Sequence, residues 1–75
     1  MQYPITLLKH SKNAVEFQGV MLSTQKFLRG MARSGFDVYA TDRILSLIEV
    51  GGSWQLFLSR AQVRMISKEA WKNVA

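Results

Sequence analysis

The alternation of apolar and polar residues near the start of the chain predicts two β-strands. Residues 5–10 are partly β-branched and follow a proline, which is typical of a first or edge strand. Residues 11–13 are all turn-forming types. Apolar and polar side chains then alternate over residues 14–22, which predicts a second strand, and Gly19 inside it indicates a β-bulge.

A helix is expected to follow the second strand directly. Ser23 can cap its first turn, because a serine hydroxyl accepts a hydrogen bond from the free amide groups there. The helix should end near Ser34. Gly35 can take up the left-handed backbone conformation and Phe36 can fold back onto the last turn, which together predict a Schellman motif.

The pattern in the second half of the chain predicts two more strands. Residues 36–42 form either a connector or a short fifth strand, and residues 43–50 have the aliphatic, β-branched content of a strand. Residues 51–53 should form a hairpin turn, because glycine tolerates the positive φ angles of tight turns. A further strand is then expected over residues 54–58.

Ser59 and Gln62 match a capping box, which predicts a second helix over residues 60–73. Each half of the chain would then consist of a hairpin, a Leu-Ser dipeptide and an amphipathic helix, which is an architectural repeat. We therefore expect a single α+β domain over residues 1–75. Its four-stranded antiparallel sheet would carry two helices on one face, in the order β-β-α-β-β-α.

Length and composition exclude several classes of protein. The chain has 75 residues, of which 48% are hydrophobic and 20% charged, as in a small globular domain. It has no Cys, so it offers no disulfide and no thiolate. No apolar run approaches the roughly 20 residues of a membrane span, and the first residues do not resemble a secretory signal. We therefore expect a cytoplasmic protein without membrane association.

The net charge of +5 is concentrated on the two predicted helices. On a helical wheel, the first helix has an apolar face about 140° wide, with its cations on the opposite side and no acid. In the second helix, cations recur every four residues and form one slowly winding stripe, and Glu69 is the only acid. The cationic positions are Lys26, Arg29 and Arg33 in the first helix and Arg60, Arg64, Lys68 and Lys72 in the second.

The missing acids on these helices predict a polyanionic partner. Like charges four residues apart repel each other by a few tenths of a kcal/mol (~0.2–0.5), so selection for stability alone would favour interleaved glutamates. Both helices are therefore expected to face nucleic-acid phosphates or an acidic protein surface. The alternative is a solvated face that is basic by chance. Trp71 borders the apolar face, where it either stacks on a base or partner ring or covers the core edge.

A second candidate surface is the sheet face that the two helices leave uncovered. An apolar face of this kind is typical of a protein interface, so we expect a homodimer joined through the sheets or another partner that covers it. The alternative is a register error of one residue, which would exchange the two faces. The large apolar side chains expected on this face are Leu8, Val20, Leu45, Leu47 and Phe57.

The chain shows no recognisable catalytic or metal-binding motif. Its single histidine, His10, has no acid or nucleophile beside it, and the acidic residues are scattered. A metal site needs several ligands at suitable spacing. Gly51 and Gly52 lack the spacing of a phosphate-binding loop. We therefore expect no enzymatic activity, no metal and no cofactor.

These observations favour a small non-enzymatic module that binds the nucleic-acid backbone through its basic helix faces. The alternative is a small phage- or plasmid-type inhibitor or adaptor, comparable in size with anti-CRISPR proteins, that docks on a host protein complex. A third reading is a self-associating structural domain whose charge keeps it in solution. The helix cations support the first hypothesis, and the apolar sheet face supports the second.

Overall fold

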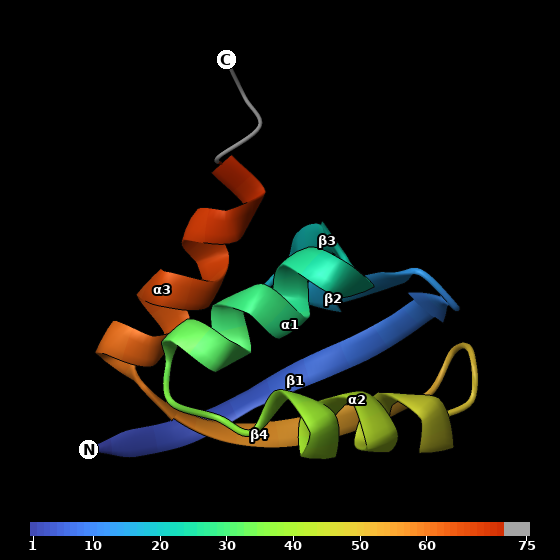
Figure 1. Ribbon diagram of the computed structural model, residues 1–75, viewed down its shortest axis with the longest axis horizontal. Coiled ribbons are helices and arrows are strands. Elements are labelled where there is room, and N and C mark those ends of the chain that lie inside the picture. The colour runs from blue at the N-terminus through green and yellow to red at the C-terminus, as the bar shows by residue number, and fades with distance from the viewer. Residues whose placement is uncertain (72–75) are drawn as a thin grey trace.

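One antiparallel sheet with helices on one of its faces is the architecture of the computed structural model, which describes residues 1–71 apart from the side chain of Trp71 (Figure 1). The strand order across the sheet is β3-β2-β1-β4, with every neighbouring pair antiparallel. The elements are β1 (Gln2–Ser11), β2 (Ala14–Phe17), β3 (Val20–Ser23), α1 (Thr24–Arg33), α2 (Val38–Leu47), β4 (Ser53–Ser59) and α3 (Arg60–Trp71).

The predicted α+β class and the four-stranded antiparallel sheet are confirmed, but the predicted order of elements is wrong. Within residues 1–71 the order is β-β-β-α-α-β-α, with three helices where two were expected. The predicted repeat of two hairpin-helix halves is also wrong, because only the first half contains hairpins. Two local misreadings, at residues 14–22 and 36–50, account for these differences.

Residues 14–22, predicted as one strand with a bulge, form a tight hairpin instead. Gln18 and Gly19 have φ angles of 50° and 74°, and positive φ at both central residues is the geometry of a two-residue hairpin turn. Phe17 therefore lies opposite Val20, and β2 pairs with β3. Apolar and polar residues keep alternating through the turn, which is why the pattern concealed it.

Residues 43–50, predicted as a strand, belong largely to the helix α2. Asp37 caps this helix, because its carboxylate oxygen Oδ1 accepts from the backbone N–H groups of Tyr39 at 2.9 Å and Ala40 at 3.3 Å. Thr41 and Leu45 are buried four residues apart, which is a helical spacing. The connector or fifth strand considered for residues 36–42 is therefore mostly the first turn of the same helix.

The two glycines predicted to turn a hairpin connect α2 to β4 instead. Gly51 has a φ of 90°, and its N–H donates to the Lys9 carbonyl at 2.7 Å. The Lys9 N–H donates to the Gly52 carbonyl at 2.9 Å. The loop is thereby joined to the end of β1, and β4 then runs antiparallel beside β1.

The three helix-terminal motifs predicted from the sequence are confirmed. The Ser23 hydroxyl caps α1 by accepting from the Lys26 N–H at 3.2 Å. Gly35 has a φ of 93°, and the Phe36 N–H donates to the Met31 carbonyl at 3.0 Å, as a Schellman motif requires. In the capping box, the Ser59 N–H donates to the Gln62 side chain at 2.8 Å, and the Gln62 N–H donates to the Ser59 hydroxyl at 3.2 Å. These motifs depend on neighbours in the chain, so the sequence was sufficient to predict them.

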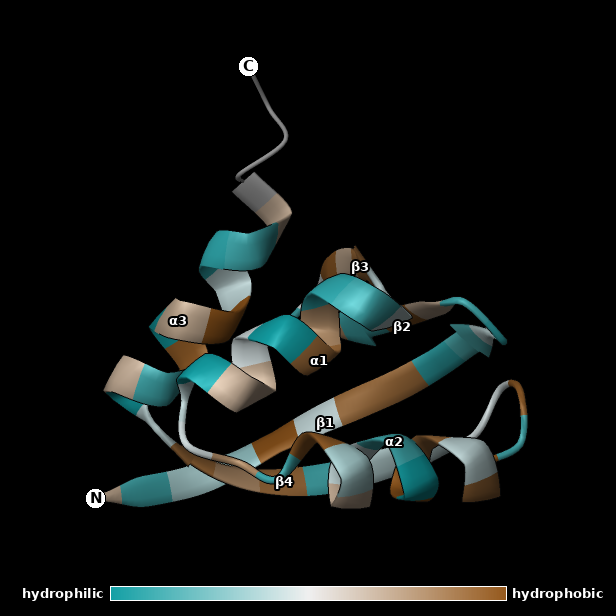
Figure 2. Ribbon diagram, in the orientation of Figure 1, coloured by the Kyte–Doolittle hydropathy of each residue, from teal (hydrophilic) through white to brown (hydrophobic). Residues whose placement is uncertain are grey.

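The hydrophobic core fills the space between the sheet and the helices. Alternating hydrophilic and hydrophobic bands along α1 and α3 mark helices with one buried side (Figure 2). Burying these side chains is the main favourable contribution to folding. The buried core consists of Ile5, Leu7, Val15, Phe17, Leu22, Leu56 and Leu58 from the sheet and Phe27, Met31, Leu45, Val63 and Ile66 from the helices.

A close contact between α1 and α3 fixes how these two helices pack. A Cβ atom on Gly30 would lie 2.9 Å from the Cα atom of Ile66, which is backbone and cannot move aside cheaply. Ile66 is completely buried, so it belongs to the core at this contact. The helices can approach this closely only because residue 30 has no side chain.

We predict that Gly30→Ala destabilises the protein. Overpacking of this kind costs about 1–3 kcal/mol of unfolding free energy, whereas alanine would otherwise favour a helix by about 1 kcal/mol over glycine. Urea unfolding monitored by tryptophan fluorescence measures the difference. Gln25→Ala, at an exposed position of α1, is the control. A Gly30→Ala variant as stable as the wild type would contradict the close contact.

A lysine from β1 caps the C-terminus of α2. The Lys9 ammonium donates to the Leu45 carbonyl at 2.8 Å and to the Ile48 carbonyl at 2.9 Å. The last carbonyl groups of a helix have no partner inside the helix, and a cation there also complements the helix dipole. α2 has no basic residue of its own in its last turn, so Lys9 supplies this charge across the fold.

We predict that Lys9→Met destabilises the protein by about 1–3 kcal/mol, because hydrogen bonds from a charged group contribute about that much. The matched control is Lys12→Met, which removes the same charge from an exposed position nearby and should change stability by less than about 0.5 kcal/mol. Urea unfolding compares the two variants. Equal stability of the two would show that the capping contact contributes nothing.

Candidate functional site

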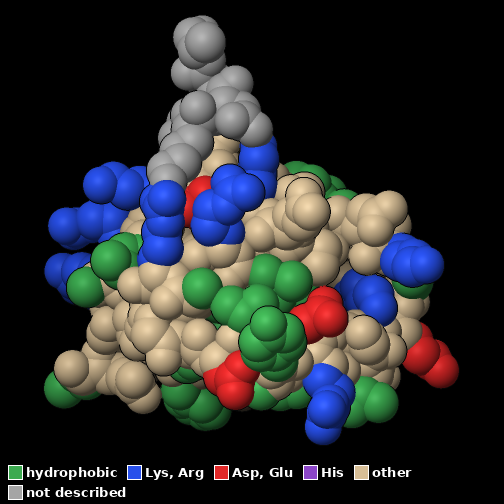
Figure 3. All heavy atoms as spheres, in the orientation of Figure 1, with side chains coloured by type: hydrophobic (Ala, Val, Ile, Leu, Met, Phe, Trp, Pro, Cys, Tyr) green, Lys and Arg blue, Asp and Glu red, His purple; other side chains and the backbone are tan. Residues whose placement is uncertain are grey.

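The cations of α1 and α3 form one surface, which we call the cationic flank. It consists of Lys26, Arg29 and Arg33 on α1 and Arg60, Arg64 and Lys68 on α3. Glu69 is the only acid in the sequences of these two helices. Lys and Arg side chains gather over α1 and α3, around one carboxylate, and the other acidic side chains visible in this view lie away from them (Figure 3).

The flank is accessible because each helix turns its apolar residues to the core. Arg60, Arg64 and Lys68 are exposed, whereas Val63 and Ile66 between them are buried. Residues four positions apart rise about 6 Å along a helix, so the three cations span about 12 Å of α3. On α1, Arg29 and Arg33 are exposed and Lys26 is half-buried.

An ion pair between the two helices neutralises part of the flank. The Arg33 guanidinium lies 3.1 Å from the Glu69 carboxylate, and only 1% of the Glu69 side chain is exposed against 51% for Arg33. A buried carboxylate needs a cation because burial removes its hydration. Within the described residues, Arg33 is the one cation of the flank in an ion pair with a carboxylate. Its charge is therefore less available to a partner than the other five.

Two further positions predicted for this surface are not part of the observed flank. The side chain of Trp71 and the whole of Lys72 lie outside the described residues. The alternatives for Trp71, stacking on a partner or covering the core edge, stay predictions. The cationic stripe predicted along the second helix is therefore described from Arg60 to Lys68.

The apolar surface predicted for the uncovered sheet face is only partly present. Leu8 and Phe57 lie on that face, and Phe57 is 59% exposed. Val20 points to the helix side, because the two-residue turn places it opposite a core phenylalanine. Leu45 is a core residue of α2, and Leu47 is the exposed last residue of that helix. The three wrong placements follow from the missed hairpin and the missed helix.

The open sheet face can be defined from strand register, because residues that alternate with the core positions point away from the helices. It carries few large apolar groups and holds no Lys or Arg among the described residues. The predicted homodimer through this face stays a prediction. The face consists of Pro4, Thr6, Leu8, His10, Glu16, Met21, Ser53, Gln55 and Phe57.

His10 has an acidic neighbour that the sequence did not reveal. Its Nε2 atom lies 2.9 Å from Oε1 of Glu16 across the β1-β2 hairpin, and both side chains are substantially exposed. Leu8 pairs with Glu16, and His10 lies two residues further along β1 on the same face, so His10 is a diagonal neighbour of Glu16. The expectation that His10 has no acid beside it is therefore wrong. An exposed pair of this kind contributes little to stability, about 0–1 kcal/mol.

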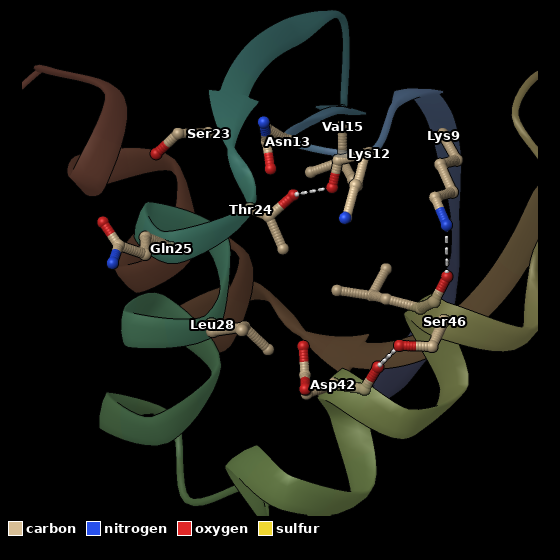
Figure 4. Close-up of a pocket in the computed structure, with 11 residues that line it drawn as sticks. Lys9, Lys12, Asn13, Val15, Ser23, Thr24, Gln25, Leu28, Asp42 and Ser46 are labelled. Atoms are coloured by element: carbon tan, nitrogen blue, oxygen red, sulfur yellow. Dashed lines mark hydrogen bonds between the residues drawn. The ribbon is translucent and has the colours of Figure 1, made fainter.

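A cleft of about 630 Å³ lies between the N-terminal turn of α1, the start of β2 and α2. Lys12 and Asp42 project into it from opposite sides, and Leu28 and Val15 supply apolar walls (Figure 4). Several polar groups around the cleft already have partners within the chain. The Thr24 hydroxyl donates to the Lys12 carbonyl, and the Ser46 hydroxyl donates to the Asp42 carbonyl.

Within residues 1–71, no three His, Cys, Asp or Glu side chains are grouped so that they could hold a metal ion. None of the helices described is long and apolar enough to span a membrane. Among the surfaces described above, the flank carries the largest group of like charges.

Comparison of the chain with models of protein families, with curated proteins and with solved structures found no match.

We predict that Arg33→Met destabilises the protein by about 1–2 kcal/mol, because the buried Glu69 carboxylate loses this ion pair while half of the arginine is already hydrated. The matched control is Arg29→Met on the same helix, which removes the same charge from an exposed position and should change stability by less than about 0.5 kcal/mol. Thermal unfolding compares the variants. Equal melting temperatures of the two variants would show that the ion pair does not stabilise the fold.

Proposed function

We propose that this protein binds nucleic acid through phosphate contacts made by the cationic flank. The observation that carries the proposal is the placement of six Lys and Arg residues and one Glu on two helices that pack side by side. A polyanion with regularly spaced charges is the partner that such a surface attracts most strongly.

The arrangement of charge on α3 supports this function over a purely structural role. Arg60, Arg64 and Lys68 repeat every four residues, so neighbouring cations repel each other by about 0.2–0.5 kcal/mol per pair. α1 has no acid with which to offset its own cations. A phosphate backbone would offset this repulsion, because each phosphate attracts the cation that it lies against. Binding also releases the counterions that were condensed on the nucleic acid.

Phosphate contacts position a protein on nucleic acid without reading its sequence. The proposed activity is therefore sequence-independent binding, with an affinity that falls steeply as salt rises. If three or four cations each neutralise one phosphate of a duplex, the slope of log K against log salt should be about −3 to −4.

We predict that the double variant Arg64→Ala with Lys68→Ala weakens binding to a fluorescently labelled duplex by about 10-fold or more at low salt, because two phosphate contacts are lost. It should also make the salt slope about 2 units less steep. Fluorescence anisotropy across a salt series measures both quantities.

The charge-matched control is the double variant Lys12→Ala with Arg43→Ala, which removes two exposed cations outside the flank. It should keep an affinity and a salt slope close to those of the wild type. A wild-type slope near zero would rule out phosphate contacts. Equal losses in the two double variants would show that net charge, rather than the flank, determines binding.

A small phage- or plasmid-type inhibitor or adaptor that docks on a protein complex is the second candidate. One observation favours it: Phe57 and Met21 on the open sheet face are 59% and 53% exposed, on a face without Lys or Arg among the described residues. A partner that is retained after nuclease treatment, is lost on Phe57→Ser and is kept by the Arg64→Ala, Lys68→Ala variant would support this candidate over the first.

A further inference from the structure

The start of β1 lies beside the junction between β4 and α3 (Figure 1). Gln2 pairs with Ser59 and Tyr3 pairs with Leu58, so the first residues of the chain reach the first residues of α3. An open hollow of about 410 Å³ lies at this place, next to the end of the cationic flank. It is lined by Met1, Tyr3, Ser59, Arg60 and Ala61.

Tyr3 stands where the helix-covered side of the sheet reaches the solvent. The next residues of β1 on the same side, Ile5 and Leu7, are sealed into the core, whereas Tyr3 is 36% exposed. An aromatic ring in this position offers an apolar surface inside an open hollow. The hollow is large enough to hold a flat ring system, since pockets for small molecules begin at about 300 Å³.

Arg60 connects this hollow to the cations of α3. It lines the hollow and is also the first member of the series that continues with Arg64 and Lys68. An aromatic surface beside a line of cations is the combination with which proteins hold single-stranded nucleic acid, because a base stacks on the ring while the backbone follows the cations. In a duplex the bases are already stacked on each other, so they cannot enter such a hollow without being flipped out.

We propose that the flank binds single-stranded nucleic acid, with one unpaired base stacked on Tyr3 in this hollow and the adjoining phosphates on Arg60 and Arg64. This inference rests on the proposed function and narrows its ligand to an unpaired strand. The base is held through its π face, so the site is tolerant of sequence. DNA and RNA share this chemistry, and the experiment includes both.

The test compares binding of labelled single-stranded DNA, single-stranded RNA and duplex DNA by anisotropy at one fixed salt concentration. Tyr3→Leu should weaken binding of the single strands about 5- to 100-fold, which corresponds to the loss of one stacked base, and leave duplex binding unchanged. Tyr3→Phe should keep the affinity, because the ring remains. The matched control, Tyr39→Leu, removes a tyrosine that is 87% exposed on α2 and should change nothing.

A second measurement on the unaltered protein guards against variants that fold poorly. A strand of abasic sugar-phosphate units keeps the phosphates and lacks the bases, so it should bind about 5- to 100-fold more weakly than the normal strand of equal length. Equal binding of the abasic strand, or equal effects of Tyr3→Leu and Tyr39→Leu on single strands, would overturn the stacking site. Absence of salt-dependent binding to every probe would instead overturn the proposed function itself.

Discussion

The close packing of α1 on α3 is the constraint on which the candidate surface depends. Gly30 lets the helices approach so closely that a Cβ at this position would lie 2.9 Å from the Ile66 Cα, and one turn further along, Arg33 reaches the buried Glu69 at 3.1 Å. A larger residue at position 30 would force the two helices apart. The same crossing therefore closes the core and brings two sets of cations together.

The central position of β1 in the sheet connects the remaining features. β2 pairs with one side of it and β4 with the other, and the pairing with β4 runs from Gln2 to Leu8, so both ends of this strand lie beside residues far away in sequence. At its C-terminal end, Lys9 holds the last carbonyl groups of α2. At its N-terminal end, Tyr3 lines an open hollow together with the first residues of α3. One strand thus positions a helix and supplies the aromatic side chain beside the flank.

The missed hairpin and the missed helix have a common physical cause. Hydrophobic periodicity identifies a strand only while the chain keeps its direction, and the two-residue turn at Gln18 and Gly19 reverses direction without interrupting the alternation. β-branched content likewise favoured a strand at residues 43–50, although the Asp37 cap and the spacing of Thr41 and Leu45 favour a helix. Leu45 and Val20 were consequently assigned to the wrong surface.

The sequence by itself determined the fold class, the ends of α1, the start of α3 and the cationic side of both helices. The helix ends and the cationic sides depend on residues within about one helical turn of each other, where hydrogen bonding and helical spacing act locally, and the fold class follows from the mixture of strand and helix patterns. Only the tertiary structure decided that the two cationic sides share one flank, that Arg33 is paired with Glu69 and that Tyr3 lies beside Arg60. Those relations depend on strand order and helix crossing, which arise when the whole core packs at once.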